Sequence, residues 1–153
     1  MDVTDLKLLS LLQVEGRISN EKLGEAVGLS ISAVNERIRK LQKQGVLLGW
    51  TAQISPKRLG LDVLAFVHIL LGQQADETLF LEGIVRTPEV LECHHITGEW
   101  SYLLKIRCKT ISHFEVVLGE KIKPIPGVLR TQTLIALSSP LDRTTLPLED
   151  YGD

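Results

Sequence analysis

The stretch that decides the first half of the fold reads SISAVNERIRKLQKQ, from Ser30 to Gln44. Its apolar residues recur at intervals of three and four and share one stripe of an α-helix: Ile31, Val34, Ile38 and Leu41. The opposite side carries small polar and charged side chains, with Arg37 at the border: Ser32, Ala33, Glu36, Arg39, Lys40 and Lys43. Ser30 is a good N-cap, and Gly45 stands where a helix would end. The pattern predicts a helix that packs on a small core and exposes a basic face.

The residues before this helix predict a second, shorter helix. Ser19 and Asn20 can cap it, and its buried positions would be Leu23, Ala26 and Val27. Residues 28–30 then form a tight, glycine-containing turn into the basic helix. Two helices joined in this way are typical of the helix-turn-helix, whose second helix lies in the major groove of double-stranded DNA. A plain amphipathic surface helix would also expose charges, so the preceding helix and turn are what favour DNA binding.

Composition narrows the class of protein. A chain of 153 residues that is 44% hydrophobic can form one or two small domains with a buried core. The net charge of −2 argues against non-specific coating of nucleic acid, but residues 30–44 carry +3 and the remainder about −5, so charge is segregated. Two cysteines are too few for a disulfide scaffold or a four-ligand zinc site. No apolar run approaches the roughly 20 residues of a membrane span, so we expect a cytoplasmic protein with no membrane partner.

We expect residues 1–54 to form a winged helix-turn-helix domain. Asp2–Gln13 has leucines at helical spacing and predicts the first of three helices. After the basic helix, Val46–Ile54 has strand character, and the glycine in its middle permits a hairpin or wing. Pro56 and Gly60 then break the periodicity. Residues 55–61 are therefore predicted to be a linker.

Residues 62–138 predict a second domain and give the chain an α+β fold class. Val63–Leu71 is apolar on both alternating faces, so it needs cover on both sides. A second copy of the chain would cover the face that its own helices leave open, which predicts a homodimer, although an intrachain sandwich would serve as well. Strand-helix-strand occurs twice, which indicates a ferredoxin-like βαββαβ arrangement with helices near 78–86 and 112–123 and a strand over 102–108. Residues 139–153 are expected to form an extended tail.

Motifs for catalysis or metal binding are not found in the sequence. His94 and His95 are adjacent, so in a strand they point to opposite faces and cannot hold one metal together. We therefore predict no metal and no cofactor. The loop Thr97–Ser101 combines a glycine, an acid, an indole and hydroxyls, and its backbone N–H groups and carboxylate would suit a zwitterionic small molecule. An ordinary polar turn would have the same composition.

Several motifs, in the same order along the chain, resemble the Lrp/AsnC (feast/famine) family of transcription regulators. In the first half they are Arg17-Ile18-Ser19-Asn20, Val27-Gly28-Leu29-Ser30, Arg37-Ile38-Arg39-Lys40-Leu41 and Gly49-Trp50-Thr51-Ala52. Pro56-Lys57-Arg58-Leu59-Gly60 is similar to that family's linker. In the second half the motifs lie at residues 88–94, 97–104 and 126–133. The resemblance covers nearly the whole chain except the tail.

This resemblance implies a cytoplasmic, sequence-specific DNA-binding regulator that is not an enzyme. It also implies dimers joined through the αβ domain, often assembled into an octamer, and an amino acid effector held between dimers. The expected DNA-binding residues are Ser30, Ser32, Ala33, Asn35, Glu36, Arg37, Arg39, Lys40 and Lys43. The expected effector-binding residues are Thr97, Gly98, Glu99, Trp100, Ser101, Tyr102, Thr131 and Thr133. The family usually has Asp where this chain has Ser101 and often Arg where it has Gln132, so the usual partner of the effector's amino group is missing.

Two other functions fit parts of the pattern. Some siroheme decarboxylases resemble the same two-domain architecture, and they would need a basic cavity to which His94 or His95 could contribute. A pure oligomerisation or ligand-storage module would have no affinity for DNA even at low salt. The basic face of residues 30–44 favours the DNA-binding regulator over both.

Overall fold

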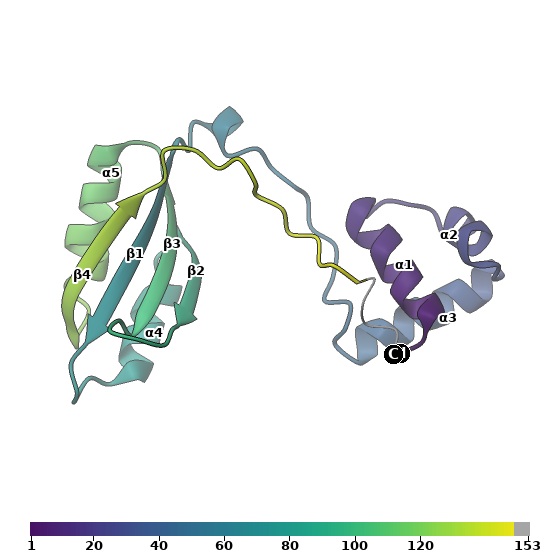
Figure 1. Cartoon of the computed structure of the whole chain (residues 1–153), viewed down its shortest axis with the longest axis horizontal. Helices are drawn as coiled ribbons and strands as arrows, with labels where there is room; N and C mark the ends of the chain where they lie inside the picture. The colour runs from purple at the N-terminus through teal and green to yellow at the C-terminus, as the bar shows by residue number, and fades with distance from the viewer. Residues whose placement is uncertain (149–153) are drawn as a thin grey trace. The chain divides into compact units, whose positions relative to one another are not determined.

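The structure, a computed structural model, describes residues 1–148 and divides into two compact units (Figure 1). The first unit comprises Met1–Gln53 together with the described residues 141–148, and the second comprises Ile54–Pro140. The expected tail is described only as far as residue 148, and that part contains no helix or strand. Residues 149–153 lie outside the described residues.

Three helices form the first unit: α1 (Val3–Val14), α2 (Asn20–Val27) and α3 (Ile31–Lys43). Each has the capping residue that its sequence requires, because Asp2, Ser19 and Ser30 accept hydrogen bonds from backbone N–H groups of the first turn. The predicted helices are confirmed to within one or two residues. Their apolar faces meet in a small core: Leu8, Leu12, Leu23, Val34 and Ile38.

Two residues that were expected in this core are exposed. Ile31 is 51% exposed because it is the first residue of α3 and projects beyond the end of the packed stripe. Ala26 is also exposed, and Gly24 is buried in its place. A Cβ on Gly24 would lie 2.5 Å from the carbonyl oxygen of Leu29, so only glycine lets the turn approach α2 this closely.

The predicted wing is wrong for the described structure. Within residues 1–148, every strand belongs to the sheet of the second unit, and Val46–Ile54 forms none. The amides of Val46 and Leu47 donate to the carbonyl of Leu41 at 3.0 and 3.2 Å, so the segment closes the end of α3. A strand requires a hydrogen-bonded neighbour, and the described part of the chain supplies none for this segment. The predicted linker contains one 3₁₀ turn, η1 (Lys57–Leu59).

The second unit is an antiparallel sheet with two helical crossovers. Its elements are β1 (Val63–Leu71), α4 (Glu77–Val85), β2 (Val90–His95), β3 (Tyr102–Cys108), α5 (Ile111–Val116), the π-helical continuation η2 (Val117–Ile122) and β4 (Val128–Ile135). The strand order is β2-β3-β1-β4, and each neighbouring pair is antiparallel. This is the predicted ferredoxin-like arrangement, and β1 and β3 begin and end at the predicted residues.

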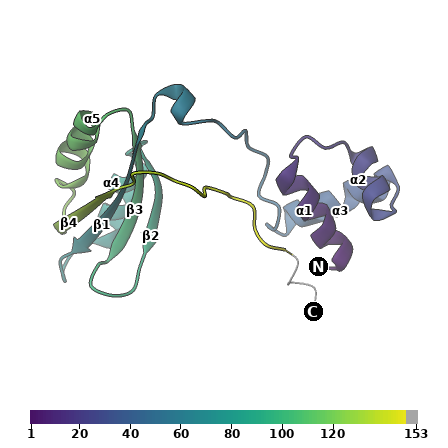
Figure 2. The same cartoon turned by 45° about the horizontal axis from the view of Figure 1, so that its top comes forward.

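The two faces of the sheet have different surroundings. Both helices pack on one face (Figure 2), which we call the helix face, where Val67 and Leu104 meet Phe80 and Phe114 in a continuous core. The opposite face carries half-buried Phe66, His68, Leu70 and Leu103, together with Leu134, which is 50% exposed. We call this second surface the open face. It is the side of β1 for which the sequence predicted additional cover.

Candidate DNA interface and effector site

The outer side of α3 presents a compact cationic surface. Arg39, Lys40 and Lys43 are exposed, and none of them forms an ion pair within residues 1–148. Ser32 and Glu36 are exposed on the same helix, and Ala33 is half-buried. The opposite stripe anchors the helix, because Val34, Ile38 and Leu41 are all buried. The helix can therefore present its cations to a ligand without disturbing the core.

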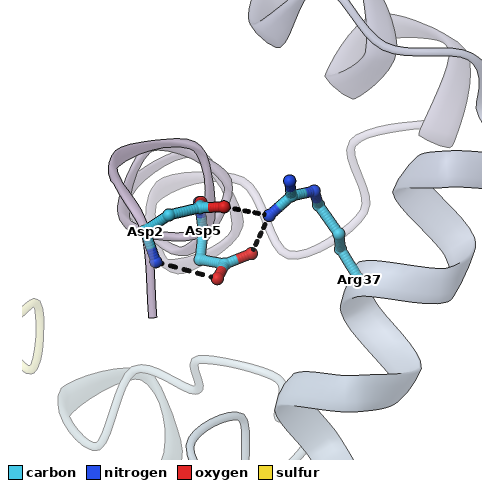
Figure 3. Close-up of polar contacts among 3 residues, drawn as sticks. All are labelled: Asp2, Asp5 and Arg37. Carbon is cyan, nitrogen blue, oxygen red and sulfur yellow. Dashed lines mark hydrogen bonds and ion pairs between the residues drawn. The ribbon is translucent and has the colours of Figure 1, made fainter.

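Arg37 lies on the flank of α3 that faces α1 (Figure 3). Its Nη1 donates to Oδ2 of Asp2 and to Oδ1 of Asp5, each at 2.7 Å. The hydrogen bond from the Asp5 amide, followed by the Arg37 guanidinium, lowers the pKa of the Asp2 carboxyl below its usual value. The Asp5 side chain is only 10% exposed, so Arg37 also neutralises a nearly buried carboxylate.

A second expected DNA-binding residue is also bonded within the unit. Oδ1 of Asn35 accepts a hydrogen bond of 2.6 Å from Nδ2 of Asn20 on α2. Together with the Arg37 pairs, this bond fixes α3 against both other helices. Two features of the sequence point to the Arg37 pairs: the position of Arg37 at the border of the apolar stripe, and the two acids at the start of α1. The contact itself depends on how α1 packs on α3, which the sequence does not show.

The loop between β2 and β3 contains most of the expected effector-binding residues. Thr97, Gly98 and Glu99 are exposed, and Gly98 has a φ of +106°, which favours glycine. Ser101 ties the loop to the end of β1. Its amide donates to the carbonyl of Ile69 at 2.9 Å, and its Oγ accepts from the amide of Leu71 at 3.1 Å. The hydroxyl that stands where the family usually has Asp is thus engaged with backbone.

Trp100 extends from this loop to the open face of the sheet. The guanidinium of Arg130 lies 4.5 Å from the centroid of its ring, and the ring of His68 lies 5.5 Å away. Arg130 also forms an ion pair with Glu99, and Nδ1 of His68 is buried without a hydrogen-bond partner among residues 1–148. Sequence analysis did not identify Arg130 or His68, because only the register of β1 against β4 brings these strands beside the loop.

The remaining expected effector-binding residues lie on the other side of the sheet. Tyr102 contacts the rings of Phe80 and His95, each with centroids 4.9 Å apart, and its hydroxyl donates to Glu77 at 3.2 Å. Burial, followed by this carboxylate, raises the pKa of Tyr102. Thr131 and Thr133 pair with Ile69 and Val67, whose side chains are in the core. Because paired residues of neighbouring strands point to the same face, both threonines are on the helix face. The structure thus brings Glu99 and Trp100 together with Arg130 and separates them from Tyr102, Thr131 and Thr133.

The adjacent histidines are directed to different partners. Nε2 of His94 lies 3.1 Å from a carboxylate oxygen of Glu92, whereas His95 stacks on Tyr102. Across residues 1–148 there is no group of three side chains placed to hold a metal ion. None of the helices in this part of the chain is long and apolar enough to span a membrane.

A helix-turn-helix unit with an outward cationic helix, joined to a ferredoxin-like unit, defines a two-domain DNA-binding regulator. The AsnC-type helix-turn-helix domain family matches residues 1–42, and the Lrp/AsnC ligand-binding domain family matches residues 64–146. The chain belongs to the Lrp/AsnC family. It is therefore a sequence-specific DNA-binding transcriptional regulator and not an enzyme, which removes the decarboxylase alternative.

Individual relatives agree with this assignment. The chain is 38% identical over 141 residues to the proline dehydrogenase transcriptional activator of Rhizobium radiobacter, covering 91% of this chain and 90% of that protein. It is 37% identical over 139 residues to the leucine-responsive regulatory protein of Escherichia coli, covering 90% and 85%. Among solved structures, a Neisseria meningitidis transcriptional regulator in complex with L-Met matches with a TM-score of 0.93, 31% identity and 97% coverage of both chains. Escherichia coli AsnC matches with a TM-score of 0.90, 32% identity and coverage of 96% and 99%.

Proposed function

We propose that this regulator binds double-stranded DNA as a homodimer through the outer side of α3, and that an amino acid bound beside the Thr97–Ser101 loop modulates it. The DNA-binding part of the proposal depends on one observation, which is that the cationic side chains of α3 are exposed and unpaired within the described residues. Arg39, Lys40 and Lys43 are exposed and have no ion pair within the described residues, while the same helix is anchored on its other side. Such an arrangement suits a helix that enters the major groove.

The nine expected residues then have four kinds of role. Ser32, Ala33 and Glu36 lie near base edges, while Arg39, Lys40 and Lys43 contact bases or phosphates. Ser30 caps the helix whose first turn approaches the DNA. Arg37 and Asn35 act by positioning, because their polar groups are engaged with α1 and α2. This division changes the expectation that Arg37 contacts DNA directly.

Charge reversals separate these roles. Arg39→Glu and Lys43→Glu should each weaken binding to duplexes selected from a random library, and each should reduce the slope of log affinity against log salt by about one. Lys7→Glu makes the same charge change at an exposed position of α1 and is the matched control. Arg37→Gln should lower affinity without changing the salt slope, since Arg37 contacts no phosphate. If neither Arg39→Glu nor Lys43→Glu changes the affinity, α3 does not lie on the DNA.

The open face supports the homodimer. Phe66, Leu70 and Leu103 lie there without a covering layer within the second unit, and a second copy of the chain would bury them. Assembly of four such dimers would give the octamer that the sequence resemblance implies, and the expected compartment is the cytoplasm. Sedimentation equilibrium should give at least twice the mass of the single chain, and Leu70→Asp should lower it. A monomeric mass at micromolar concentration would contradict the dimer.

The loop and β4 support an amino acid effector. Glu99 and Arg130 place opposite charges side by side on partly exposed side chains, which complements an α-ammonium and an α-carboxylate. Trp100 and His68 lie beside them and provide a flat wall for a side chain. A structurally similar regulator from Neisseria meningitidis was solved in complex with L-Met, and the family domain that matches residues 64–146 is a ligand-binding domain.

Calorimetry with the twenty amino acids tests this part of the proposal. One or a few should release heat with the unaltered protein and none with Arg130→Gln. Arg86→Gln removes another exposed, ion-paired arginine, at the end of α4, which does not contribute to the loop, and this variant should retain the signal. If no amino acid gives heat with the unaltered protein, the effector proposal fails while the DNA proposal stands.

A further inference from the structure

The C-terminal segment makes a specific contact with α1 of the first unit. The side-chain amide of Gln13 donates to the carbonyl oxygen of Leu146 at 2.8 Å, and the Leu146 amide donates back to Oε1 of Gln13, also at 2.8 Å. Gln13 therefore satisfies both backbone polar groups of a single residue. A neighbouring β-strand makes the same pair of hydrogen bonds to a residue of an exposed strand. The contact thus recognises extended backbone at one position of the tail.

An apolar groove surrounds this contact. It has a volume of about 230 Å³ and is formed by α1, by the segment after α3 and by the tail: Leu9, Leu12, Val46, Trp50, Leu146 and Leu148. The segment after α3 is the one that did not form the predicted wing, so its apolar side chains are available to line the groove. Leu146 and Leu148 are two residues apart in an extended segment, and both line this groove. Contacts between partly exposed apolar side chains and a paired backbone contact therefore occur at the same place.

The docked segment is continuous with β4. The last ladder contact after β4 is the hydrogen bond from the Ala136 amide to the Leu64 carbonyl, at 2.9 Å. The groove residue Leu146 follows ten residues later in the chain. The strand that holds Arg130 is thus joined directly to the segment that Gln13 binds. The two units are consequently joined by two stretches of chain, the linker near residue 54 and the segment near residue 140.

We propose that residues 141–148 are a docking strap that binds against α1 of the same chain and forms one wall of the groove beside Trp50. The strap covers apolar surface of the DNA-binding unit. The two hydrogen bonds from Gln13 to the Leu146 backbone fix which residue of the strap lies against α1. It also gives the sensor strand β4 a second covalent route to that unit, besides the linker. The docking requires neither DNA nor an effector, and only the communication through β4 rests on the proposed function.

Hydrogen exchange of the Leu146 amide, measured by NMR on the full chain, tests the docking. In the unaltered protein this amide should exchange more slowly than its random-coil rate, and Gln13→Ala should accelerate it about tenfold because its acceptor is removed. Leu146→Asp should release the whole segment by placing a charge against the groove. Leu141→Asp is the matched control, because Leu141 is as exposed as Leu146 but does not line the groove. Random-coil exchange in the unaltered protein, or full protection in Gln13→Ala, would overturn the proposal.

Mixed dimers test whether the strap docks on its own chain. One subunit carries Gln13→Ala with an intact tail, and the other carries Leu146→Asp with an intact Gln13. If docking is within one chain, the Leu146 amide of the first subunit stays unprotected in the mixture. Recovery of its protection would show that the tail docks on the partner, and would overturn the assignment to the same chain. DNA affinity at Arg39 and Lys43 is measured separately, so failure of the strap leaves the DNA proposal intact.

Discussion

The two units achieve a defined geometry by different means. The first has a buried cluster of only five side chains, whereas the cluster of the second contains thirteen. In the first unit, polar contacts between distant residues supply what the small core does not: Asp2 and Asp5 with Arg37, Asn20 with Asn35, and Gln13 with Leu146. In the second unit, the antiparallel register and the helix face fix the geometry. The second unit also has ion pairs between distant residues, such as Lys121 with Glu89, but its larger core carries a greater share of the packing.

Cavity-forming substitutions should have the largest effects and should be confined to one unit each. Leu23→Ala in the first unit and Phe80→Ala in the second both empty fully buried positions, and costs of about 2–5 and 3–5 kcal/mol respectively are expected. Calorimetry should show each variant lowering one unfolding transition. Because the first core is small, Leu23→Ala should leave that unit close to unfolded at 25 °C.

Two exposed valines are the controls for this experiment. Val14→Ala in α1 and Val85→Ala in α4 alter side chains that are 81% and 83% exposed, and their effects should stay within about 0.5 kcal/mol. If Leu23→Ala and Phe80→Ala lowered both transitions equally, the two units would unfold together and the contrast between them would be wrong.

A pair of glycines tests how far the first unit depends on a single close approach. Gly24→Ala would place Cβ 2.5 Å from the Leu29 carbonyl oxygen, which belongs to backbone and cannot simply rotate away. We expect a loss of about 1–3 kcal/mol in urea unfolding, even though alanine has the better helix propensity. Gly119→Ala in η2 meets no atom within 4 Å and should be neutral or stabilising by up to about 1 kcal/mol. An equal effect of both would contradict the packing of the turn on α2.

Local patterns were sufficient to predict most of the elements and the order in which they occur. The ends of β1 and β3 were predicted to the residue because their apolar runs end at polar or turn-forming residues. Leucines at helical spacing predicted α1, and the caps at Ser19 and Ser30 marked the starts of α2 and α3. The wing failed because strand character in Val46–Ile54 says nothing about whether a partner strand is available.

The candidate sites were predicted less completely, for a physical reason. The exposed cations of α3 follow from helical periodicity within one segment, so they were found from the sequence. The engagement of Arg37 with Asp2 and Asp5 depends on residues more than 30 positions away. In the same way, Arg130 reaches Trp100 only through the register of β4 on β1, and that register also places Thr131 and Thr133 on the opposite face.

Acid titration should have the smallest effect on the free energy of unfolding. It distinguishes the contact of Asp2 with Arg37 in the first unit from the ion pair of Glu92 with Lys105 in the sheet. The folded-state pKa of Asp2 is lowered by the Asp5 amide and then by Arg37, so its contribution to stability is present above the unfolded value of about 3.9 and is lost as pH falls through the folded value. Glu92 behaves likewise in the second unit, where hydrogen bonds from Lys105 and then His94 lower its pKa. The temperatures of both unfolding transitions should therefore fall on acidification below about pH 4.

Asp2→Asn should reduce this acid-induced fall for the first transition alone, and Glu92→Gln for the second alone. Because both groups are largely exposed, solvent screening keeps the changes small, and an Asp2→Asn variant with an unaltered acid-induced fall would show that the contact with Arg37 does not stabilise the unit.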